Sequence, residues 1–329
     1  MIGAFKSQSI TMQVLIPVLG FLPFITFILF KAEPLLSEHN AQGWLYTSFA
    51  IGLSRYPVWM ILFSYLQMVV ISFVLFRTNI KYELLGQRTV LISYLFIIIS
   101  CIPLVQQFFH PAGLSSLFIF AGLVSLFRLY HNHKGLPDIF NAGVLLGLAI
   151  LCYPPMILVF VIYVLAIARL KQIRWRDFVV LLLGIMVPVW IVVAILLINK
   201  NIEYAWIGFI QWFEIRTTWP PPLSGNSILW LIWFGWILLS LPMLINAGRS
   251  RKDVGRRILN VFIQFVWIVP LMILLFERVS LEVWQLVAIP LSLIYSMIII
   301  NSRQNRKTSL LFLSFLIFLV VFQIQYFIA

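Results

Sequence analysis

Ionisable side chains that could support chemistry gather in the loop that follows the first apolar run. They are Lys31, Glu33, Glu38, His39 and Arg55. A carboxylate here can act as a general base toward a hydroxyl acceptor, which makes Glu33 and Glu38 the candidate catalytic residues. The neighbouring cations can hold a phosphate or pyrophosphate leaving group. The same residues can instead be ordinary interfacial charges at helix ends, so both interpretations stay open.

Two long loops are expected to hold such a site, at residues 31–57 and 199–227. Each contains a run of apolar and aromatic residues at spacings of three and four, centred on 44–52 and 202–213, which predicts helices lying in the membrane interface. Arg216 follows the second run and precedes a stiff triple-proline segment. The candidate substrate-binding residues are Lys31, His39, Arg55 and Arg216.

The composition requires lipid as the solvent. Hydrophobic residues make up 62% of the 329 residues and charged residues only 10%, with a mean hydropathy of +1.04. A soluble domain contains about 25% charged residues. The sequence therefore predicts an all-α, polytopic transmembrane helical bundle that forms a single integral membrane domain over residues 1–329. The net charge of +13 fits membrane topology signals, and we expect no nucleic-acid partner.

Apolar runs predict about eleven membrane spans. They cover residues 10–30, 58–76, 89–109, 112–130, 139–153, 154–170, 178–198, 228–247, 258–276, 283–301 and 308–328. A bilayer needs roughly 20 helical residues, so the fifth and sixth runs are short and could form a re-entrant hairpin instead.

The distribution of basic residues predicts the orientation. With a cytoplasmic N-terminus, 18 of the 23 Lys and Arg residues fall in cytoplasmic segments and five fall outside. Every predicted inner segment is basic, as the positive-inside rule requires. We therefore expect a bacterial inner (cytoplasmic) membrane protein whose C-terminus lies outside.

The stretch 141–177 carries the sharpest local signal. Pro154 and Pro155 interrupt its apolar residues, and a basic cluster closes it at Arg169, Lys171, Arg174 and Arg176. Because proline lacks an N–H and disfavours helix at the preceding residue, we expect two helices joined by a tight turn. Single prolines at 188, 242, 270 and 290 predict kinks within spans.

No cofactor or metal follows from the sequence. His131 and His133 stand two apart without further ligands, and Cys101 and Cys152 lie singly in apolar runs. Hydrolase, P-loop, zinc-protease and paired-aspartate prenyltransferase motifs are all missing from the sequence. Glutamines within the spans, Gln67, Gln264 and Gln285 among them, are expected to hydrogen-bond between helices.

One stretch resembles a known class of enzymes. The order of first span, acidic outer loop, interface helix and many tightly connected spans is similar to the GT-C class of membrane glycosyltransferases, and residues 143–155 (GVLLGLAILCYPP) resemble a span common in that class. The resemblance implies a polyprenyl-phosphate-linked sugar donor and a catalytic carboxylate in the first outer loop, here Glu33 or Glu38. The chain also resembles multi-span bacterial membrane proteins of similar length. Gly143 and Gly147 have a second explanation, because small residues four apart permit close helix packing.

Three functions remain open at this stage: a GT-C-like transferase, a non-enzymatic envelope scaffold or accessory subunit, and a transporter. The partners expected for all three are membrane lipids, with polyprenyl phosphate specific to the transferase.

Overall fold

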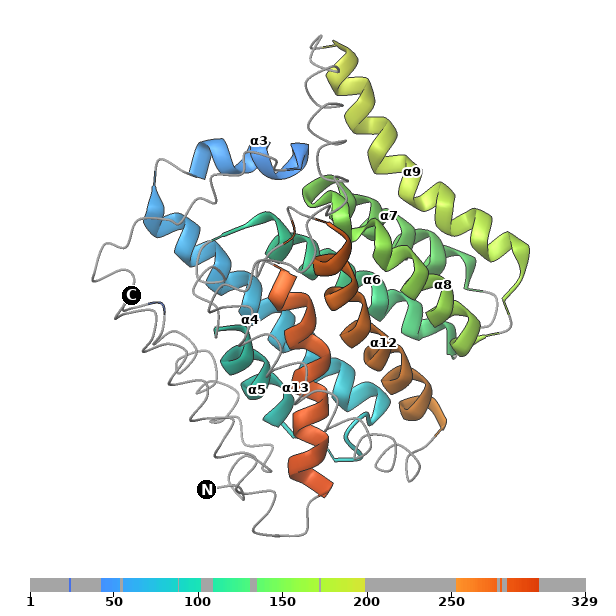
Figure 1. Cartoon of the computed structure of the whole chain (residues 1–329). Helices are drawn as coiled ribbons and strands as arrows, with labels where there is room; N and C mark the ends of the chain where they lie inside the picture. The colour runs from blue at the N-terminus through green and yellow to red at the C-terminus, as the bar shows by residue number, and fades with distance from the viewer. Residues whose placement is uncertain are drawn as a thin grey trace.

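The computed structural model describes Phe24 and residues 43–53, 56–87, 89–101, 109–130, 135–171, 173–198, 253–276, 279 and 283–301. These residues form helices and turns and contain no β-strand, which confirms the all-α prediction (Figure 1). Four helical segments are long and apolar enough to cross a membrane: Pro57–Tyr82, Pro111–Tyr130, Trp175–Ile198 and Val254–Met272. Together with several shorter apolar helices they identify an integral membrane protein, while the eleven spans remain a prediction.

Helices α4 (Pro57–Tyr82) and α5 (Leu91–Ser100) form the first described pair. Proline occupies the first turn of α4, where its missing N–H costs nothing. The helix ends at Glu83, which takes a left-handed conformation with φ of 50°. The helix extends beyond the predicted apolar run 58–76, and its final turns contain Arg77 and Lys81. The predicted run 89–109 yields a described helix of only ten residues.

The two prolines interrupt the helix as predicted. Helix α7 (Leu136–Cys152) ends one residue before Tyr153, a 3-10 turn η3 (Pro154–Leu158) follows, and α8 (Val159–Leu170) begins only after it. Helix α6 (Pro111–Phe127) and the 3-10 turn η2 (Arg128–Tyr130) precede them. Neither proline has an N–H, and both lie in the first turn of η3, where a backbone N–H would have no partner within the helix.

Three longer helices complete the described bundle: α9 (Trp175–Ile198), α12 (Asp253–Leu275) and α13 (Trp284–Asn301). Pro188, Pro270 and Pro290 lie inside them, as the sequence predicts. Helix α9 packs mainly on α7 and leaves much of its apolar surface exposed, which suits contact with lipid. The four segments 10–30, 199–227, 228–247 and 308–328 lie outside the described residues, apart from Phe24.

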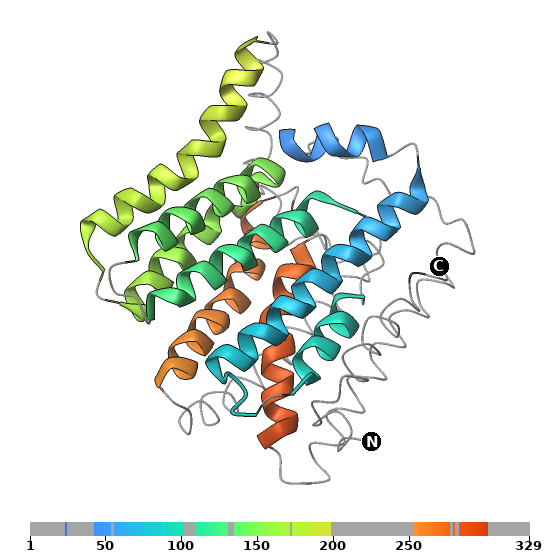
Figure 2. The ribbon, with the colours of Figure 1, turned by 180° about the vertical axis from the view of Figure 1, so that it is seen from behind.

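One continuous apolar core joins helices α4 to α9 with α12 and α13. Helix α6 contacts α4, α7, α8 and α13 and buries most of its side chains, and it lies behind α12 in Figure 1 and in front of it in Figure 2. Helix α3 (Trp44–Leu53) lies across one end of that bundle (Figure 1). The predicted helix in the first long loop is therefore confirmed, whereas its counterpart in residues 202–213 lies outside the described part of the chain.

Candidate functional site

The predicted catalytic and substrate-binding residues lie outside the described residues. They are Lys31, Glu33, Glu38, His39, Arg55 and Arg216. Their assignment as a site therefore stays a prediction, and the described structure shows the frame to which both long loops are attached.

The first loop is anchored through α3. A Cβ on Gly43 would collide with the backbone carbonyls of Leu151 and Cys152, so only glycine lets the start of α3 approach the end of α7 this closely. The Tyr46 hydroxyl donates to the Phe109 carbonyl at 2.6 Å, and the two rings stack with centroids 5.4 Å apart. We call this end of the bundle the α3 end.

The α3 end covers the tight turn more fully than the sequence suggests. Tyr153, Pro154, Pro155 and Met156 are all buried, so the turn is not a simple exposed loop. The C-terminal end of α8 lies away from it, because the Arg169 carbonyl accepts from Arg257 of α12 at the opposite end. The pair therefore runs through the bundle and back.

Neutral polar side chains meet just inside the α3 end. His110 caps α6, since its Nδ1 accepts from the Gly113 N–H at 3.0 Å. Gln67 of α4 donates to Gln285 of α13 at 2.9 Å, which confirms interhelical bonding for this pair. A Cβ on Gly113 would lie 2.9 Å from Gln285 Oε1 and 3.0 Å from Gln67 Nε2. The cluster is thus closely packed around that glycine.

The charged side chains described in the structure all belong to the opposite end, which we call the basic end. They are Arg77, Lys81, Glu83, Arg128, Asp138, Arg169, Lys171, Arg174, Arg176, Asp177, Arg256 and Arg257. Contacts tie these segments together: Arg257 donates to the Arg169 carbonyl at 3.1 Å, and Arg128 faces Asp138 at 3.8 Å. Three basic segments that are separate in sequence therefore share one end of the bundle.

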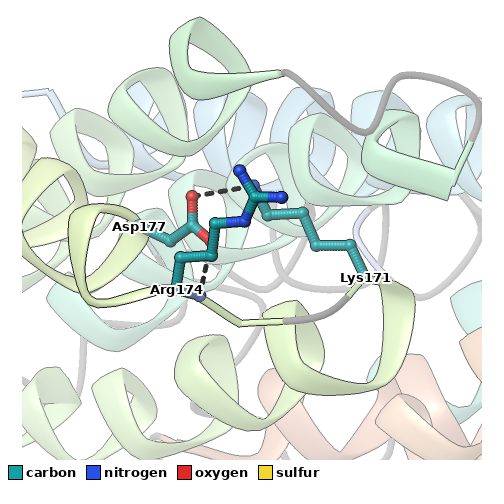
Figure 3. A network of polar contacts seen from close by, with 3 residues as sticks. All are labelled: Lys171, Arg174 and Asp177. Carbon is teal, nitrogen blue, oxygen red and sulfur yellow. Dashed lines mark hydrogen bonds and ion pairs between the residues drawn. The ribbon is translucent and has the colours of Figure 1, made fainter.

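A buried ion pair holds the turn between α8 and α9. Lys171 Nζ lies 2.7 Å from Asp177 Oδ1, and the two side chains are only 6% and 2% exposed. The other Asp177 oxygen accepts from the Arg174 N–H at 3.0 Å, as the third helical residue of a capping box does (Figure 3). Each buried charge is therefore compensated, and the basic turn has a fixed shape.

Arg169 reaches a partner that sequence spacing alone does not reveal. With its amide oriented to accept, Gln264 Oε1 lies 3.1 Å from both Nε and Nη2 of Arg169. Gln264 belongs to the candidate span Val254–Met272, well inside its ends. The sequence places Arg169 simply among end-of-span charges, and the structure shows its guanidinium bound at the level of the span. The signal was present as Gln264, a polar residue within an apolar run.

The glycines of the GT-C-like stretch serve helix packing. A Cβ on Gly143 would lie 2.5 Å from the Leu181 carbonyl, and one on Gly184 would lie 2.9 Å from Gly143 Cα. Gly147 meets the Ile185 carbonyl and Pro188 in the same way. Helices α7 and α9 thus cross in backbone contact, and the small-residue spacing is explained by that crossing.

Comparisons with known proteins find no matching family model and no match among curated proteins or solved structures.

Proposed function

We propose that the protein resides in a bacterial cytoplasmic membrane with its basic end in the cytoplasm. The observation that supports this is the gathering of nine described Lys and Arg side chains at one end of the bundle, with none described at the α3 end. By the positive-inside rule the N-terminus is then cytoplasmic and, with eleven spans, the C-terminus is outside. A reporter active only outside the cytoplasm should work when fused to Ala329. Activity of the opposite reporter there would contradict the span count.

In this orientation the α3 end faces the outside. We propose that the protein acts there as a GT-C-like transferase on a polyprenyl-phosphate-linked sugar. The supporting observation is the anchoring of α3 by Gly43 and Tyr46. This anchor ties the loop that contains Glu33 and Glu38 to the bundle end. One glutamate acts as general base, and Arg55 and Arg216 bind the phosphate.

A second candidate is an envelope scaffold or accessory subunit. It is favoured by the chemistry of the α3 end, where the described contacts are aromatic rings, amides and backbone carbonyls without a charged side chain. Such a surface suits docking of another protein. The third possibility, a transporter, would need polar groups open to a substrate, whereas Gln67 and Gln285 bond to each other.

Complementation of a deletion strain separates the first two functions. Glu→Gln keeps the shape and hydrogen-bonding ability of the side chain but removes the base, so Glu33→Gln or Glu38→Gln should abolish activity at normal protein level. Glu282→Gln, which removes an outer carboxylate elsewhere, is the matched control and should complement. Arg55→Lys and Arg216→Lys should weaken phosphate binding, because an ammonium cannot make the planar bidentate contact. Full complementation by the double glutamate variant would reject the transferase and leave the scaffold.

A further inference from the structure

The Arg169 guanidinium occupies an unusual depth for a charge. Its partner Gln264 lies seven residues along α12 from Arg257, which corresponds to about 10 Å of helix rise. Arg169 lies in the last turn of α8, and because side chains in a helix point back toward its N-terminus, the guanidinium is directed into the span. Arg169 is nevertheless exposed. A cation exposed at the level of an apolar span is costly and usually serves a function.

Arg257, on the neighbouring helix α12, contacts the backbone of Arg169. Its Nη1 donates to the Arg169 carbonyl at 3.1 Å, and its guanidinium lies 6.0 Å from the centre of the Tyr130 ring. Helices α8 and α12 pack directly on each other, so both arginines border the same seam. Contacts with neutral groups therefore restrain both guanidinium groups.

Neither arginine has a carboxylate partner among the described residues. The two ion pairs found there engage Asp177 with Lys171 and Asp138 with Arg128. The amide of Gln264, the ring of Tyr130 and a backbone carbonyl orient the arginines but cancel no charge. Two cations that lack a carboxylate partner and border the same helix seam attract an anion.

An apolar stripe leads from this pair into the membrane. Val161 and Leu165 precede Arg169 at intervals of four on α8, so the three residues share one face, and the first two are 53% and 41% exposed. Trp267 and Leu271 are exposed on α12 farther from its basic end. Paired cations above exposed apolar side chains match a phosphate headgroup above acyl chains.

We propose that Arg169 and Arg257 form a binding site for the phosphate of an anionic phospholipid, at the α8–α12 seam in the leaflet at the basic end. The planar guanidinium groups bind phosphate oxygens in bidentate fashion, and Tyr130 borders the headgroup. This site is separate from the transferase or scaffold surface proposed at the α3 end and does not depend on it.

The test is a lipid titration of the purified full-length protein in detergent, followed by native mass spectrometry. Phosphatidylglycerol should bind more tightly than phosphatidylcholine with the same acyl chains. Replacing both Arg169 and Arg257 by Gln should weaken phosphatidylglycerol binding by about tenfold or more, since two charge-assisted contacts are lost. Inorganic phosphate should not displace the lipid. Displacement at equal concentrations would identify a free-phosphate site and overturn the lipid proposal.

A matched control removes two cations from the same end of the bundle. Arg77 and Lys81 of α4 lie against the rings of Phe73 and Tyr82. Replacing both by Gln should change the affinity less than about twofold. An equal loss in both double variants would show that net charge alone attracts the lipid and would overturn the site.

A conservative pair covers the case in which the Gln variant fails to fold. The double Arg→Lys change at 169 and 257 keeps both charges but removes the bidentate geometry, so binding should weaken several-fold, by about threefold or more. Wild-type affinity in the Lys variant would overturn the proposal.

Discussion

At the α3 end, helices meet through stacked rings, amides and backbone carbonyls, whereas at the basic end they meet through ion pairs and guanidinium contacts. Tyr46 and Phe109 represent the first kind of contact, and Lys171 with Asp177 represents the second. Both contacts bury their polar groups. They differ in the free energy of unfolding that is lost when one partner is removed.

Removing one partner should destabilise the protein by different amounts in the neutral and the charged contacts. A buried hydrogen bond between neutral groups contributes about 1 kcal/mol net. A buried ion pair contributes little beyond an apolar replacement, but breaking it leaves an uncompensated charge. We therefore expect the basic end to be the more vulnerable to single substitutions, although its surface is the more polar.

The largest effect is expected from Asp177→Asn. The amide keeps the size of the side chain but leaves the Lys171 charge buried without compensation, so the free energy of unfolding should fall by about 3–5 kcal/mol. Asp138→Asn, beside an Arg128 side chain that is 57% exposed, should cost less than about 1 kcal/mol. Reversible unfolding in mixed detergent measures both. Equal losses would mean that burial does not distinguish the two pairs.

A smaller loss is expected where α7 and α9 cross. Gly184→Ala places a methyl group 2.5 Å from the Phe140 carbonyl and should destabilise the protein by about 1–3 kcal/mol. Gly52→Ala is the matched control, because a Cβ at that position in α3 meets nothing within 4 Å. It should stabilise the helix by about 0.5–1 kcal/mol. Thermal unfolding should separate the variants in opposite directions.

The α3 end should respond to acid through His110, which lies immediately before the candidate span Pro111–Tyr130. Burial lowers the pKa of His110 to about 3, and its Nδ1 must stay unprotonated to accept from Gly113. The unfolded chain binds the proton more readily, so this contribution is complete above about pH 6.5 and declines as the pH falls toward 3. His110→Asn keeps a capping oxygen and should flatten that part of the stability profile. An unchanged profile would show that other groups cause it.

The smallest effect is expected from Tyr46→Phe. Loss of the 2.6 Å hydrogen bond to Phe109 should cost about 1 kcal/mol and loosen α3 without unfolding the bundle. Hydrogen exchange should rise in residues 44–53 more than in α4. Tyr56→Phe, at an exposed position, is the control and should leave exchange unchanged.

Local features of the sequence determined the helical class, the break at Pro154 and Pro155, the helix over 44–53 and the separation of charge. Each follows from rules that act over a few residues: the missing N–H of proline, the 3.6-residue period and the cost of charge in lipid. The gathering of Arg128, Arg169 and Arg257 at one end follows from the same alternation of spans.

Only the tertiary structure decided which residues meet. The sequence leaves open whether Gly143 serves an enzyme-like motif or a helix crossing, and its contact with Gly184 shows the crossing. The partnership of Arg169 with Gln264 joins residues 95 positions apart, and that of Gln67 with Gln285 joins residues 218 apart. Hydrophobic periodicity says that such residues face a neighbour, but the identity of the neighbour depends on how whole helices pack.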